Sequence, residues 1–130
     1  MAATRAIPII ICGRTSAIGE AVMAGIQPEY KTVAFIKSTE QGIKEIPPLL
    51  ESKKASAVVA GGGYDDAAIK EMRAAVTQGG KDVPWLRADT SESMPPVGPE
   101  YGKKMVLRVK EKLDEVFGKG RGVDGGIYWY

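Results

Sequence analysis

Residues 7–26 read IPIIICGRTSAIGEAVMAGI, and this stretch decides the fold. Its first six residues form a continuous and largely β-branched run, which is typical of a strand buried on both faces of a parallel sheet. Ile18, Val22 and Ile26 then recur at the spacing of one helix face. A strand, a glycine-bracketed turn and a helix over residues 17–26 are the opening of a βαβ unit.

The remainder of the chain repeats this alternation of strands and helices. Further strands are expected over residues 32–36, 55–60 and 82–86. Further helices are expected over residues 40–52, 65–77 and 100–117. Pro84 favours an edge position for the last strand, and Pro47-Pro48 predicts two short turns instead of one helix. The pattern predicts an α/β fold, a minimal Rossmann-like or flavodoxin-like parallel sheet of about four strands with helices on both faces. The aromatic tail at 122–130 is expected to dock on the domain or on a partner.

Composition excludes several classes of function. The 130 residues suit one domain, 1–130, and a 44% hydrophobic content is that of a globular protein. With 18 basic and 16 acidic residues, the chain lacks the charge of a nucleic-acid binder. No apolar run is long enough to span a membrane, so a soluble, cytoplasmic protein is expected. The absence of histidine excludes Ser-His-Asp and Cys-His mechanisms and argues against a metal site. The single cysteine, Cys12, is interpreted as a buried core residue.

Three loops are expected at the edge of the sheet where ligands bind, beyond the carboxyl ends of the strands. The candidate cofactor-binding residues in these loops are Gly13, Arg14, Thr15, Ser16, Ala17, Ile18, Lys37, Ser38, Gly61, Gly62, Gly63 and Tyr64. In the first loop, unpaired N–H groups at the start of the helix favour an anion. Hydroxyl groups and the Arg14 guanidinium add donors, so this loop is predicted to bind phosphate.

The second and third loops bear on the identity of the cofactor. NAD binders place an acidic residue near the end of the second strand, where it accepts a hydrogen bond from the ribose 2′-hydroxyl. Here that position offers Lys37 and Ser38, which favours NADP(H) over NAD(H). Gly61, Gly62 and Gly63 let the backbone lie close to a cofactor, and Tyr64 is expected to stack on a ring or to form a pocket wall.

The 13–19 turn resembles the G-x-x-x-G-x-G fingerprint of the short-chain dehydrogenases/reductases. Gly13, Ile18 and Gly19 match, and Ala17 replaces the middle glycine. This resemblance implies a Rossmann-like fold and a nucleotide cofactor. The family's catalytic Tyr-x-x-x-Lys has no counterpart, since Met105 stands four residues after Tyr101, and dehydrogenase activity is therefore not implied.

Nearly the whole chain is also similar to a family of small, largely uncharacterised fungal proteins with an implied Rossmann-like NAD(P)-binding fold. The segments that carry this similarity are 28–30, 61–66, 83–87 and 98–103.

Three functions stay open at this point. The first is an NADP(H)-binding module without chemistry of its own, a sensor or regulatory protein. The second is a small NADPH-dependent reductase, and the third is an interaction protein that binds no nucleotide and in which Gly13 and Gly19 serve only packing.

A homodimer is expected because C2 dimers are the commonest soluble oligomers. Asp65 and Asp66 are interpreted as helix caps, and Tyr101 and Lys104 as surface residues of the last helix.

Overall fold

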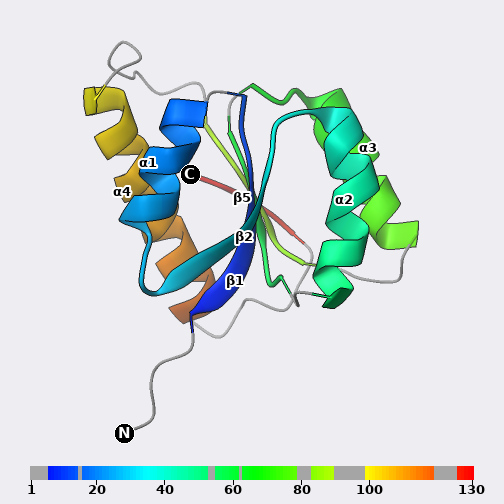
Figure 1. Ribbon diagram of the computed structural model, residues 1–130, viewed down its shortest axis with the longest axis horizontal. Coiled ribbons are helices and arrows are strands. Elements are labelled where there is room, and N and C mark those ends of the chain that lie inside the picture. The colour runs from blue at the N-terminus through cyan, green and yellow to red at the C-terminus, as the bar shows by residue number, and fades with distance from the viewer. Residues whose placement is uncertain are drawn as a thin grey trace, which may run out of the picture.

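The computed structural model describes residues 6–14, 16–52, 55–61, 63–78, 83–89, 99–118 and 126–130. Strands and helices alternate along the chain (Figure 1). The elements are β1 Ile7–Cys12, α1 Ser16–Gly25, β2 Tyr30–Ile36, α2 Thr39–Ser52, β3 Val58–Ala60, α3 Asp66–Gln78, β4 Trp85–Arg87, α4 Pro99–Gly118 and β5 Ile127–Trp129.

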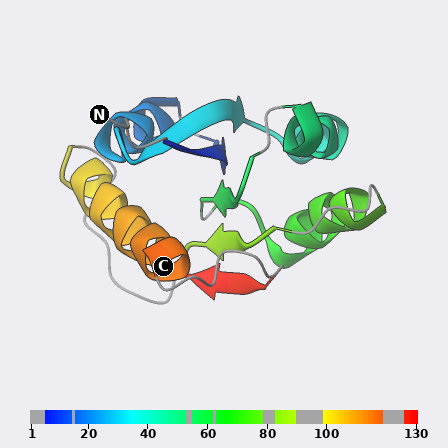
Figure 2. The ribbon, with the colours of Figure 1, turned by 90° about the horizontal axis from the view of Figure 1, so that it is seen from below.

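The strands form one parallel sheet in the order β2-β1-β3-β4-β5. Figure 2 shows the sheet between two helix pairs, with α1 and α4 on one face and α2 and α3 on the other. The predicted α/β class, with a parallel sheet and helices on both faces, is confirmed. The strand order is that of the flavodoxin-like layout, in which the chain changes direction between β1 and β3.

The position of β1 in the sheet explains why its sequence is continuously apolar and does not alternate with polar residues. Ile10 and Cys12 face the core beneath α2 and α3, whereas Ile9 and Ile11 face the core beneath α1 and α4. All four side chains are buried because the sheet is covered on both faces.

The sheet has five strands where about four were expected, because residues 127–129 of the aromatic tail pair with β4, which confirms that the tail docks on the domain. The expectation of an edge position for β4 is wrong. Strand β4 is therefore internal and β5 lies at the edge. Pro84 is compatible with an internal β4 because it precedes the strand, where its carbonyl accepts the Val58 N–H and its missing N–H is not needed.

The expectation of two short turns at Pro47-Pro48 is also wrong, since α2 runs unbroken through both prolines. The prolines remove the donors for the carbonyls of Ile43 and Lys44, and both of those residues are exposed, where water can hydrate the carbonyls. Ile46 and Leu50 are buried in the core. Burial of this face overrides the local preference of proline.

Helix α4 contributes an apolar face to the core on the α1 side of the sheet. Met105, Val109, Leu113 and Val116 are buried and recur at helical spacing, as the sequence predicts. Within the ranges described above, no helix combines the length and the apolar character that crossing a bilayer requires.

Candidate functional site

Hydrogen bonds join the loops that follow β1, β2 and β3. The carbonyl oxygen of Ile36 accepts both the Gly13 N–H and the Tyr64 hydroxyl, each at 2.9 Å. The Gly61 N–H donates to the Cys12 carbonyl, also at 2.9 Å. The three loops predicted to share one edge of the sheet therefore do share it, and they are fixed relative to one another.

The glycines of the 13–19 turn lie against the ring of Phe35 from β2. A Cβ atom on Gly19 would lie 2.5 Å from the ring atoms Cε1 and Cζ, and one on Gly13 would lie 3.1 Å from Cε1. Both glycines thus make room for an aromatic ring, which is the packing role left open above. Ser16 begins α1 and Ala17 is exposed in its first turn, whereas Thr15 falls outside the described residues.

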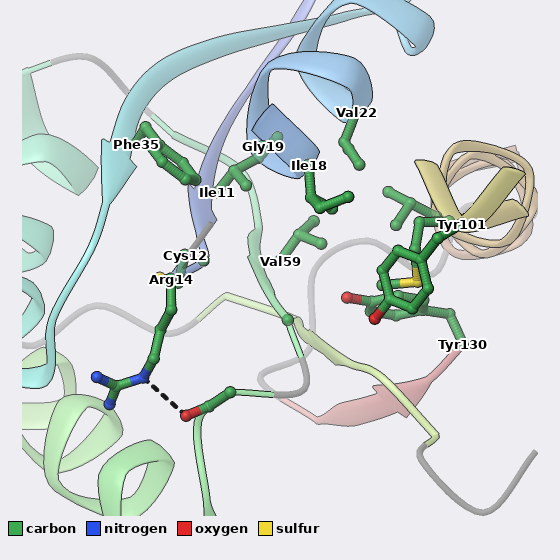
Figure 3. A pocket seen from close by; sticks show the side chains of 15 residues that line it. Ile11, Cys12, Arg14, Ile18, Gly19, Val22, Phe35, Val59, Tyr101 and Tyr130 are labelled. Atoms are coloured by element: carbon green, nitrogen blue, oxygen red, sulfur yellow. Dashed lines mark hydrogen bonds between the residues drawn. The ribbon is translucent and has the colours of Figure 1, made fainter. Parts of the chain in front are cut away.

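Arg14 reaches from the end of β1 to the loop after β3. Its Nε donates to the Gly63 carbonyl at 2.8 Å (Figure 3). Its guanidinium lies 4.8 Å from the centre of the Tyr64 ring. A Cβ on Gly63 would lie 3.0 Å from Arg14 Cδ, so glycine permits this approach. Among the described residues, the two terminal amino groups of Arg14 have no hydrogen-bond partner. The cation is held in place and keeps free donors.

Tyr64 belongs to the core beneath Arg14. It is 2% exposed, and burial raises the pKa of its hydroxyl to about 12. Its ring stacks under the guanidinium instead of facing a ligand pocket. Gly61 lies at the end of β3, and Gly62 falls outside the residues that the structure describes.

Lys37 and Ser38 take part in the N-terminal cap of α2. The Ser38 hydroxyl accepts the Gln41 N–H at 3.1 Å, and the Gln41 side chain accepts the Lys37 N–H at 2.9 Å. This reciprocal arrangement is close to a capping box, and the sequence S-T-E-Q at 38–41 signals it. The Ser38 oxygen therefore accepts within the cap and its O–H can still donate, while the Lys37 side chain is exposed.

The interpretation of Asp65 as a cap is confirmed, since its carboxylate accepts the Ala68 N–H at 2.8 Å. Asp66 instead pairs with Arg87 at 2.6 Å, and the Arg87 guanidinium lies 4.6 Å from the centre of the Trp129 ring.

A pocket of about 140 Å³ opens beside the 13–19 turn, between α1, α4 and the ends of β1 and β3 (Figure 3). Its walls are mostly apolar. They include Ile11, Gly13, Ile18, Gly19, Val22, Phe35, Val59, Gly61, Tyr101, Met105, Val109 and Tyr130. Cys12 also lines it, and burial raises the pKa of this thiol to about 12, so the thiol is protonated and inert at neutral pH.

Two tyrosines that line this pocket were not predicted as site residues from the sequence. Tyr101, expected at the helix surface, is half-buried and lines the pocket, whereas Lys104 is exposed as expected. The sequence did hold a signal for Tyr101, since this residue stands four positions before the buried Met105 and so lies on the same face of the helix. Tyr130 is buried, donates its hydroxyl to the Ala60 carbonyl at 2.8 Å, and has its pKa raised well above the usual range by burial.

No protein-family profile and no solved structure matches the chain. A curated relative is kojic acid related protein 6 of Aspergillus oryzae, which is 41% identical over 132 aligned residues. The alignment covers 91% of this chain and 82% of that protein. The chain belongs to the family of this relative.

In this member of the kojic acid related protein 6 family, α4 presents Tyr101 and Met105 to the pocket one turn apart. Their spacing is that of the tyrosine and lysine in the Tyr-x-x-x-Lys pattern of the short-chain dehydrogenases/reductases. A thioether stands where that pattern has an ammonium group, so the described residues that line the pocket supply a tyrosine hydroxyl without a lysine beside it.

Proposed function

We propose that the protein is a small NADP(H)-binding protein of the cytoplasm that serves as a sensor or regulatory module. The observation that carries this proposal is the position of the 13–19 turn. It follows β1 beside β3, at the point where the chain continues into α1 on one face of the sheet and into α3 on the other. In open α/β sheets ligands bind at this switch point, and the start of α1 favours phosphate there.

Charge at the same edge supports a cofactor with an additional phosphate. Arg14 holds its guanidinium across the ends of β1 and β3 with two amino groups left to donate. The exposed Lys37 follows β2, and no carboxylate occupies that position. The two cations are the groups proposed to contact the 2′-phosphate, and the Ser38 hydroxyl, whose oxygen accepts the Gln41 N–H, keeps its own proton to donate to it.

The proposal is tested by thermal unfolding with NADPH, NADP⁺, NADH, FMN and ATP. Kojic acid joins the panel because the relative's name connects that protein with it. A ligand at about 100 times its dissociation constant adds about 2.7 kcal/mol to the stability. We expect this rise with NADP(H), and a smaller rise in Arg14→Gln and Lys37→Gln; Lys70→Gln on the exposed side of α3 is the control. Equal effects of NADH and NADPH would refute the 2′-phosphate assignment, and no effect of any nucleotide would favour an interaction protein.

A small NADPH-dependent reductase is the second candidate, and the Tyr101 hydroxyl in a pocket beside the turn favours it. This function predicts slow oxidation of NADPH in the presence of a carbonyl or quinone substrate, with loss of turnover in Tyr101→Phe. No turnover across a broad substrate panel would exclude it in favour of the binding module.

We further propose a homodimer formed through β5. This strand is at the sheet edge, and its side chains Ile127 and Trp129 are 36% and 49% exposed. Light scattering after size-exclusion chromatography would report twice the chain mass, and Trp129→Lys would return the monomer mass.

A further inference from the structure

The pocket between α1 and α4 has the size of one ring. Its volume of about 140 Å³ is close to that of an engineered apolar cavity of about 150 Å³ that binds benzene in another protein. It cannot enclose a dinucleotide, but it can hold a single six-membered ring.

The walls select a neutral ligand. Ile18 and Val22 of α1 lie beside Val59 of β3 (Figure 3), and Met105 of α4 also lines the pocket. Arg14 is the only charged residue among the described residues that line it, and its guanidinium is directed to the Gly63 carbonyl. A charged group held between Ile18, Val22 and Val59 would lose its hydration without gaining a partner, because the Arg14 guanidinium extends away from these side chains (Figure 3).

Among the described residues, one polar group of the pocket has no hydrogen-bond partner. The Tyr130 hydroxyl donates to the Ala60 carbonyl, whereas no such bond is formed by the Tyr101 hydroxyl. Figure 3 shows both hydroxyl groups directed toward the interior of the pocket. Tyr101 can therefore donate to an acceptor on a ligand, and the Tyr130 oxygen can accept from one.

We propose that this pocket binds a neutral, planar six-membered ring that carries an oxygen substituent. The ring lies between Ile18 and Val59, and its oxygen meets the Tyr101 hydroxyl. This site adjoins the proposed nucleotide site and shares Gly13 and Ile18 with it. The proposal goes beyond nucleotide binding, since the contacts that it uses, Val59 and the Tyr101 hydroxyl, are not assigned to the nucleotide.

The test is a titration followed by methyl NMR, with phenol as the neutral probe, toluene as the probe without oxygen and benzoate as the charged probe. We expect phenol to shift the methyl signals of Val22 and Val59 in a saturable way at pH 7. Benzoate should bind at least tenfold more weakly. Tyr101→Phe should weaken phenol binding by about twofold to tenfold, the range of one net hydrogen bond, and leave toluene unchanged. Tyr30→Phe, which loses a hydroxyl at the opposite edge of the sheet, is the matched control.

Filling the pocket provides the second test. Ile18→Trp and Val22→Phe place additional atoms in the ring site, and circular dichroism establishes that each variant is folded. Phenol binding should be lost in either folded variant. Absence of saturable phenol binding to the wild type, equal binding of benzoate, an equal loss of toluene in Tyr101→Phe, or unchanged binding in a filled variant would each overturn the proposal.

Discussion

Replacement of Gly19 by alanine tests why the 13–19 turn contains glycine. In the structure a Cβ at this position would lie 2.5 Å from two carbon atoms of the Phe35 ring, about 1 Å closer than ordinary van der Waals contact. The ring or α1 must therefore move. A glycine kept only for the approach of a nucleotide would show no such conflict in the unliganded protein.

The expected loss follows from two opposing effects. Overpacking of this kind costs about 1–3 kcal/mol, whereas glycine to alanine within a helix gains up to about 1 kcal/mol. Gly19 is buried and lies within α1, so both effects apply. With the full helix gain, Gly19→Ala should therefore lower the free energy of unfolding by about 0–2 kcal/mol.

A double-mutant cycle with Phe35→Leu, measured by urea unfolding, separates the two effects. Leucine lacks the outer ring atoms that meet the new methyl group, so in this background Gly19→Ala should stabilise by up to about 1 kcal/mol. An equal loss in both backgrounds would refute the reasoning, since the strain would then have another origin. A stabilising effect of Gly19→Ala in the wild type would refute it as well.

Three further predictions concern stability. Ser38→Ala should lower the free energy of unfolding by about 1 kcal/mol through loss of the α2 cap, measured by urea unfolding, with the exposed Ser52→Ala as control. Tyr64→Phe should lose about 1 kcal/mol in the same assay and not more, because the Ile36 carbonyl keeps the Gly13 N–H; a loss above about 3 kcal/mol would contradict this. Burial raises the pKa of Cys12 from 9.0 to about 12, so above pH 9 the thiol of the unfolded chain ionises first and stability falls as pH rises, by up to about 1.4 kcal/mol per pH unit. Subtracting the pH profile of Cys12→Ala isolates this effect, and a thiol that reacts with Ellman's reagent in the native state at pH 8 would contradict it.

The α/β class follows directly from the sequence because its signals are local. A continuous apolar run at 7–12 requires cover on both faces, and the helix-period pattern after Gly13 supplies the first covering helix. The common edge of the three loops follows from topology alone, since the carboxyl ends of parallel strands meet there.

Features that depend on tertiary contacts could not be predicted from the sequence. The three residues of β5 are too few to show a period, and their pairing with β4 is a long-range contact. The prolines of α2 predict a break that burial of Ile46 and Leu50 overrides. Phe35 reads as an ordinary strand residue, and only the structure shows its ring filling the space left by the two glycines.

The most direct test of the central claim is an amide NMR titration with NADPH. The account predicts saturable shifts confined to the carboxyl edge of the sheet, at Gly13, Arg14, Ser16 and Ala17, at Lys37, and around Gly61 and Gly63, and weaker shifts at Lys37 with NADH. Unchanged spectra at millimolar NADPH, or shifts at the opposite edge around Tyr30, would contradict it.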